Sequence, residues 1–99
     1  MTLRVTRFEP TPNPDALKAV LTPADHPALP VAPATRWYPN DAAAAADPLA
    51  RAVAGVPGVA AVLLGAGWLT VTRRKGQAWS GLRRSVEQAV ASCFEGNHP

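Results

Sequence analysis

The sequence predicts an α+β domain in which two helices lie on one face of a largely antiparallel sheet. Three observations predict it: strand-like segments come first, a short helix and a β-hairpin follow, and the best amphipathic helix comes last. Hairpin-linked strands and helices with one apolar side form two layers of this kind. With 99 residues the chain has the length of one domain, so we expect residues 1–99 to form a single unit.

The first third of the chain predicts two strands joined by a stiff corner. Residues 2–9 mix β-branched and apolar side chains with arginine, which is typical of a strand, and Pro10 ends it. Residues 11–14 contain two prolines, which lack amide donors and drive their predecessors to extended geometry. Asn13 between these prolines favours a tight, rigid turn. Residues 15–21 then predict the second strand.

Residues 22–46 form an irregular segment rich in proline and alanine. Five prolines between positions 23 and 39 exclude a continuous helix or a central strand. Residues 35–38 still fit a short edge strand that Pro39 stops. Residues 42–46 have high helix propensity but only alanine to bury, so they fit a single helical turn.

A helix start follows at Asp47 and Pro48, a capping carboxylate and then a proline at the first helical position. Gly55 ends this helix, and Pro57 prevents its return. Between the two prolines, Pro48 and Pro57, the apolar residues recur at the spacing of one helical face: Leu49, Ala52, Val53 and Val56.

A β-hairpin is predicted next. Residues 59–64 are wholly apolar and rich in β-branched side chains, which predicts a buried strand, and residues 65–67 supply two glycines for the hairpin loop. Residues 68–73 return as a strand with alternating faces. Trp68, Thr70 and Thr72 lie on one face, and Leu69, Val71 and Arg73 on the other.

The clearest helix is predicted over residues 77–95, with Gly96 as its cap. Its apolar side chains are spaced by three and four residues: Trp79, Leu82, Val86, Ala89, Val90, Cys93 and Phe94. Much of the apolar content of the chain is alanine, which buries little area. We therefore expect most of the large side chains in the core, together with the leucines and valines: Phe8, Trp37, Tyr38, Trp68, Trp79 and Phe94.

Composition excludes several classes of protein. One cysteine, Cys93, can form neither an internal disulfide nor a Cys-x-x-Cys metal or cluster site. The first residues alternate polar and apolar side chains, unlike a signal peptide, and no apolar run approaches a membrane span. The net charge of +3 is mild. These features predict a cytoplasmic protein that uses neither a membrane nor a resident cofactor.

Several blocks in order resemble the amino-terminal domain of Nfu-type iron–sulfur scaffold proteins. The family pattern is Thr-Pro-Asn-Pro-Asn-x-Leu-Lys-Phe, then Pro-Leu-Ala, then Pro-Gly-Val before a hairpin with Thr-Val-Thr, and then Trp-x-x-Leu-Lys-Pro. The matching positions are residues 11–18 apart from Asp15 and Ala16, residues 48–50, residues 57–59, Val62, Gly65, residues 70–72, Trp79 and Leu82.

This chain departs from the family pattern at Gly67, which replaces a hairpin aspartate, and at Arg84, which replaces a proline. The family's scaffolds also carry a second domain whose Cys-x-x-Cys holds the cluster, and the 99 residues contain no such pair. The resemblance therefore implies an accessory, non-catalytic module that binds other proteins of iron–sulfur assembly or their clients.

Two features are candidates for partner binding. One is the rigid turn with the lysine that follows it, which has little entropy left to lose on docking: Thr11, Pro12, Asn13, Pro14 and Lys18. The other is the one concentration of positive charge, around the start of the last helix: Arg73, Arg74, Lys75, Arg83 and Arg84. The alternatives are a turn that only sets strand register and a solvated basic face that keeps the protein soluble.

Other functions are possible for the same residues. The basic side chains suit a small module that binds anions, acidic peptides or phosphopeptides and has no role in clusters. Nucleic acid is disfavoured, because Trp68 is the one plausible exposed aromatic beside them. Cys93 fits a small buried apolar residue, or a ligand shared across a dimer that carries a cluster. The two histidines, His26 and His98, are isolated in the sequence, and Asp25 beside His26 is too few ligands for a metal site. No serine has a histidine that suggests catalysis.

Overall fold

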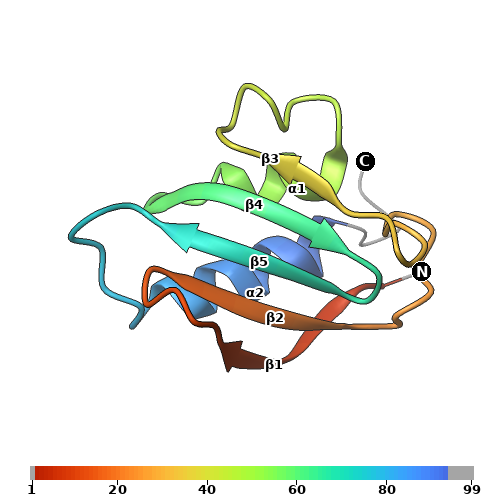
Figure 1. Ribbon diagram of the computed structural model, residues 1–99, viewed down its shortest axis with the longest axis horizontal. Coiled ribbons are helices and arrows are strands. Elements are labelled where there is room, and N and C mark those ends of the chain that lie inside the picture. The colour runs from red at the N-terminus through yellow and green to blue at the C-terminus, as the bar shows by residue number, and fades with distance from the viewer. Residues whose placement is uncertain (1, 94–99) are drawn as a thin grey trace.

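The computed structural model describes residues 2–93. It contains five strands and two helices, in the order β1 (Arg4–Pro10), β2 (Ala16–Thr22), β3 (Arg36–Tyr38), α1 (Pro48–Ala54), β4 (Val59–Gly65), β5 (Trp68–Arg73) and α2 (Leu82–Cys93). The strands form one antiparallel sheet in the order β1-β2-β5-β4-β3. Both helices lie behind this sheet in Figure 1, which confirms the predicted α+β fold with helices on one face. Neither of these helices has the length and apolar character needed to traverse a lipid bilayer.

The two outer strands of the sheet are interrupted or short. The register between β1 and β2 shifts between Val5 and Arg7, which is a β-bulge at Thr6. On the other side, β3 has only three residues, which pair with β4 from Arg36 to Tyr38. The predicted edge strand is therefore present and forms one border of the sheet.

The core lies between the helices and the covered face of the sheet. Leu69 and Val71 of β5 and Leu64 of β4 are buried there. The facing side of α2 contributes Leu82, Val86 and Val90. The residues of the buried core cluster are all leucine, valine or alanine, so the core is built from small and medium side chains that pack between two layers.

The expectation that most of the large side chains enter the core is confirmed for the leucines and valines but is wrong for the aromatic residues that the structure describes. Trp37 is 57% exposed, while Phe8, Tyr38 and Trp79 are partly buried against the border of the core. The reason is that helices cover only one face of the sheet. Trp37 pairs with Leu63 on the open face, where Trp68 also lies.

The prediction that Gly65 belongs to the hairpin loop is wrong, because Gly65 is the last residue of β4 and pairs with Trp68. A Cβ atom at Gly65 would lie 2.2 Å from ring atoms of Trp68, so the indole occupies the space above the glycine. The turn itself consists of Ala66 and Gly67, and Gly67 has a φ of 82° that favours glycine.

Helix α1 has the predicted bounds because its sequence supplies both ends. The Asp47 side chain accepts hydrogen bonds from the amides of Leu49 and Ala50, and Pro48 occupies the first turn. Gly55 closes the helix with its N–H bonded to the Arg51 carbonyl. It does so with a right-handed φ of −77°, so no left-handed cap is needed here.

Helix α2 begins at Leu82, five residues later than the predicted start at Gln77. Gly76 and Gly81 adopt φ values of 85° and 79°, which a right-handed helix does not accommodate. Trp79 therefore belongs to the connection between β5 and α2 rather than to the helix. The predicted end of the helix and Phe94 lie outside the described residues.

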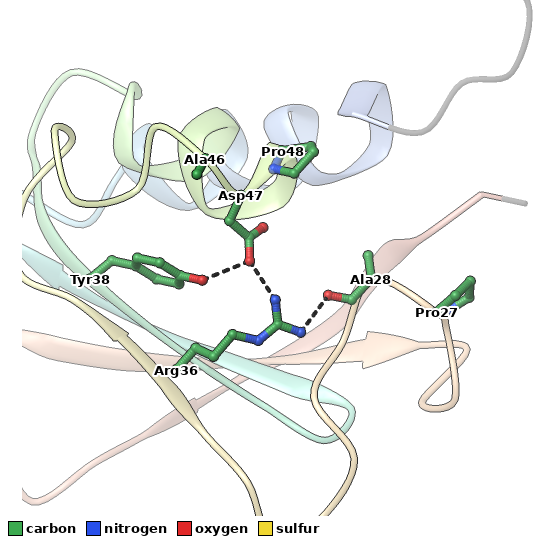
Figure 2. Close-up of a pocket in the computed structure, with 7 residues that line it drawn as sticks. All are labelled: Pro27, Ala28, Arg36, Tyr38, Ala46, Asp47 and Pro48. Atoms are coloured by element: carbon green, nitrogen blue, oxygen red, sulfur yellow. Dashed lines mark hydrogen bonds and ion pairs between the residues drawn. The ribbon is translucent and has the colours of Figure 1, made fainter.

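The Asp47 carboxylate also anchors the irregular segment to α1. Its second oxygen accepts a hydrogen bond from Arg36 Nη1 at 2.7 Å and one from the Tyr38 hydroxyl at 2.8 Å. The other end of the Arg36 guanidinium donates to the Ala28 carbonyl at 3.2 Å. Figure 2 shows this chain of contacts, which joins the loop before β3, the strand β3 itself and the start of α1.

Replacing Asp47 should destabilise the domain in proportion to the bonds removed. Asp47→Ala removes the cap and the partner of Arg36, so we expect a loss of about 2 kcal/mol in the free energy of unfolding. Asp47→Asn keeps a capping oxygen but loses the charge, so we expect a smaller loss of about 1 kcal/mol in the free energy of unfolding. Urea denaturation measures both. A cost below about 0.5 kcal/mol for Asp47→Ala would show that the carboxylate is not the anchor described here.

Tyr38 provides a second test, because it is the one tyrosine of the chain. Burial, and then its hydrogen bond to the Asp47 carboxylate, raise the pKa of the Tyr38 hydroxyl above the ordinary value of 10.0. A raised pKa in the folded state means that this contribution to stability is complete below pH 10 and is lost as pH rises further. Absorbance titration should give a pKa above 10, and Asp47→Asn should lower it. An equal pKa in both proteins would contradict the contact.

Candidate functional site

Three connections that carry the sequence motifs meet at one end of the sheet. They are residues 11–15 between β1 and β2, residues 57–58 between α1 and β4, and residues 73–79, which run from the last residue of β5 into the connection to α2. We call these three segments the motif end. Figure 1 shows them together at the left of the view, away from the turn that joins β4 to β5.

The first segment is a turn held by its own side chains. Thr11 Oγ1 accepts from the Asn13 amide at 3.2 Å and lies within hydrogen-bonding distance of the Ala16 carbonyl at 3.1 Å. Asn13 Oδ1 accepts from the Asp15 amide at 2.9 Å. Local bonds of this kind replace those that the two prolines cannot make, so the turn is fixed independently of any partner.

The turn is tied to the third segment by long-range contacts. Arg73 Nε lies 3.2 Å from Asp15 Oδ1, and the Arg73 amide donates to the Asp15 carbonyl at 2.8 Å. Trp79 Nε1 donates to the Pro14 carbonyl at 3.3 Å, and the Arg73 guanidinium lies 5.2 Å from the centre of the Trp79 ring. Asp15, where the family pattern has asparagine, is thus the ionic partner of Arg73.

The second segment joins the same end through Gly58. Its carbonyl accepts from the Arg74 amide at 2.7 Å. Gly58 has a φ of 98°, and a Cβ atom there would lie 2.7 Å from the Gln77 side chain. Only glycine combines this backbone conformation with this close approach, which explains the Pro-Gly-Val block.

The predicted partner-binding residues are only partly brought together. Thr11, Pro12, Asn13 and Pro14 lie beside Arg73, but Lys18 lies on the open face of the sheet with its ammonium 5.4 Å from the Trp68 ring centre. Arg74 and Lys75 are exposed in the third segment. Arg83 and Arg84 are exposed in the first turn of α2, and the Arg83 amide donates to the Trp79 carbonyl.

A cavity of about 380 Å³ lies on another side of the domain, around the anchor shown in Figure 2. It is lined by Pro27, Ala28, Arg36, Tyr38, Ala46, Asp47 and Pro48. Asp47 is buried, and its two oxygens already accept four hydrogen bonds. Those bonds engage the carboxylate in the fold, which disfavours a role as a general base. The helix cap at Asp47 is predictable from the sequence, but the contacts of Arg36 and Tyr38 with it carry no sequence signal.

His26 is buried rather than merely placed in a loop. It lines a second cavity of about 270 Å³ with Ala24, Asp25, Pro27 and Leu29 among its neighbours. His26 Nδ1 accepts from the Ala28 amide at 3.0 Å, which stabilises the turn that follows. In the part of the chain that the structure describes, no three His, Cys, Asp or Glu side chains are grouped as a metal site would require.

Cys93 is half-buried at the end of α2. Its Sγ donates to the Pro48 carbonyl at 3.4 Å, so it links α2 to the start of α1. Burial, and then the Asp47 carboxylate, raise the pKa of the thiol. A raised pKa reduces the thiolate that metals and electrophiles require.

Comparisons with known proteins agree with the sequence motifs. Residues 5–97 match the family described as "Scaffold protein Nfu/NifU N terminal". The Drosophila erecta protein named "NFU1 iron-sulfur cluster scaffold homolog, mitochondrial" is 32% identical over 91 residues, which cover 90% of this chain and 30% of the relative. The protein of the same name from Drosophila ananassae is 31% identical over the same shares. The chain thus spans about a third of the length of these curated relatives.

Solved structures support the fold. The crystal structure of protein SAV1430 from Staphylococcus aureus has a TM-score of 0.64 and 16% identity, covering 87% of this chain and 96% of that one. Its solution NMR structure has a TM-score of 0.58 and 18% identity, covering 97% and 94%. The match over nearly the whole sequence, with relatives named as iron–sulfur cluster scaffolds, shows that this chain belongs to the Nfu/NifU N-terminal domain family.

Proposed function

We propose that this domain is a non-catalytic module of iron–sulfur cluster assembly that docks on other proteins through the motif end and the first turn of α2. The observation that carries the proposal is the meeting of three sequence motifs at one end of the sheet, away from the core. A surface made of connections that are fixed in advance loses little entropy on binding. Such a surface is suited to recognising a partner.

Docking rather than chemistry also fits the side chains that are present. The buried carboxylate of Asp47 is engaged in four hydrogen bonds, and Cys93 has a raised pKa. The 99 residues contain one cysteine, so a Cys-x-x-Cys cluster site would have to come from another polypeptide segment. In this proposal the domain positions a partner, and cluster chemistry takes place elsewhere.

The second candidate is an anion- or phosphopeptide-binding module with no role in clusters. The exposed cations Arg74, Lys75, Arg83 and Arg84 favour it. The two candidates differ in the identity of the proteins that bind, since both use the same surface.

Affinity capture from an extract of the source cells tests the proposal. The domain should retain proteins of iron–sulfur assembly, and Arg74→Ala/Arg83→Ala should retain several-fold less. Arg4→Ala/Arg51→Ala is the matched control, since these exposed arginines lie on β1 and α1; it should retain as much as the unchanged domain. If the unchanged domain retains only unrelated proteins, the role in cluster assembly is wrong. Equal retention by all three would mean that this surface is not the one that docks.

The state of Cys93 separates docking from cluster carriage by this domain alone. Because burial raises the thiol pKa, Cys93 should react with a disulfide reagent more slowly than free cysteine near pH 8, and should reach the free rate after denaturation in urea. Anaerobic reconstitution with iron and sulfide should leave the domain without bound iron. Fast thiol reaction together with stoichiometric iron would identify Cys93 as a ligand instead.

A further inference from the structure

We propose that the partner presents an acidic segment, a stretch rich in aspartate and glutamate, to the four exposed cations Arg74, Lys75, Arg83 and Arg84. We call these four side chains the basic patch. This inference rests on the proposed function, because it specifies what docks at the motif end.

The basic patch is left without internal partners. Elsewhere, Arg7 pairs with Glu9, Arg36 with Asp47 and Arg73 with Asp15. Within residues 2–93, the four side chains of the basic patch have no ion pair, side-chain hydrogen bond or ring contact, and all four are exposed. Four like charges within eleven residues repel one another, and a partner of opposite charge relieves that repulsion.

The start of α2 strengthens the positive potential. Leu82 and Val86 are buried, so Arg83 and Arg84 lie on the outer side of the helix. The first turn contains no acidic residue. The N-terminal end of a helix is already positive, so acidic side chains are the ones that stabilise it. Two arginines at this end add to the attraction for an anionic partner.

The surroundings favour several separate carboxylates over one phosphate group. Phosphate sites typically use free backbone amides as a cradle. Around these cations, three amides are already bonded within the fold, which leaves fewer for a cradle: Arg74 donates to Gly58, Gln77 to Arg74 and Arg83 to Trp79. The cations extend from a loop to a helix as separate, solvated charges. This arrangement suits an extended acidic segment that meets them one after another.

Arg73 has a different role in this proposal. Its guanidinium is engaged by Asp15 and covers the Trp79 ring, so it joins the turn to the loop rather than contacting the partner. We therefore expect Arg73→Ala to reduce stability, whereas substitutions in the basic patch should reduce binding and leave stability nearly unchanged.

Fluorescence anisotropy with a labelled glutamate-rich peptide tests the inference. Arg83→Glu/Arg84→Glu should weaken binding by about tenfold or more, while Arg4→Glu/Arg51→Glu, which changes the net charge equally, should weaken it by less than about twofold. A glutamine-rich peptide of the same length should not bind. Affinity should also fall as salt is raised, because exposed charges are screened. Equal weakening by both variants would show that only net charge matters and would overturn the inference.

A competition experiment with inorganic phosphate distinguishes an acidic-peptide site from a phosphate site. At equal ionic strength phosphate should displace the peptide no better than chloride; saturable displacement by phosphate would instead mean an anion site. Different experimental outcomes would contradict the acidic partner and the role in cluster assembly. If Arg83→Glu/Arg84→Glu still captures cluster-assembly proteins but does not bind the peptide, the acidic partner is wrong and the basic patch is not the docking surface, while the role in assembly stands. If the unchanged domain binds the peptide but captures no such proteins, the role in assembly is wrong.

Discussion

The Asp47 carboxylate is the contact on which the second half of the domain depends. It caps α1 through two backbone amides and at the same time receives Arg36 and Tyr38 from β3. A carboxylate has enough lone pairs for four such bonds, so one buried charge can satisfy a helix end and an edge strand together. Arg36 extends the connection to the Ala28 carbonyl, which gives the proline-rich segment a fixed path along the domain. Without this anchor, β3 would keep its three-residue pairing with β4 and the packing of Tyr38 against the core.

The motif end differs from the Asp47 anchor, because several weak contacts hold it together instead of one buried carboxylate. The turn at residues 11–15 is held by hydroxyl and amide hydrogen bonds. It meets Arg73 and Trp79 through one exposed ion pair, one backbone hydrogen bond and one hydrogen bond from the indole. Exposed ion pairs contribute little individually, but together these contacts fix the relative position of two loops. The basic patch then extends from this fixed base toward solvent.

Most of the fold could be predicted where the sequence carries local signals. The bounds of α1 follow from Asp47, Pro48 and Gly55. The strand over residues 68–73 follows from the alternation of its side chains between the two faces of the sheet. The start of α2 could not be predicted, because apolar spacing continues back to Trp79 while the φ of Gly81 is set by the tertiary path of the loop. The placement of Trp37 depends on which face of the sheet the helices leave open, and a single strand does not reveal this.

The candidate site shows the same division. Charge and proline content predict the turn and the basic residues as candidates, but they do not predict the contacts between the turn and the loop after β5. Asp15 and Arg73 are 58 positions apart, and no periodic pattern links them. Arg36 and Tyr38 were similarly hidden, because their partner Asp47 already had a local role as a helix cap. Lys18 was grouped with the turn by its position in sequence, whereas strand geometry places it on the open face beside Trp68.

The borders of the sheet have a consequence for how such a domain can be used. An outer strand with unpaired backbone groups invites further strands, including those of another copy. Here one border is kinked by the bulge at Thr6 and ends in Pro10, and the other is limited to the three residues of β3. Neither border offers a long, flat template for strand addition. A domain that resists lateral growth in this way can stand beside other folded units without their strands merging with its own.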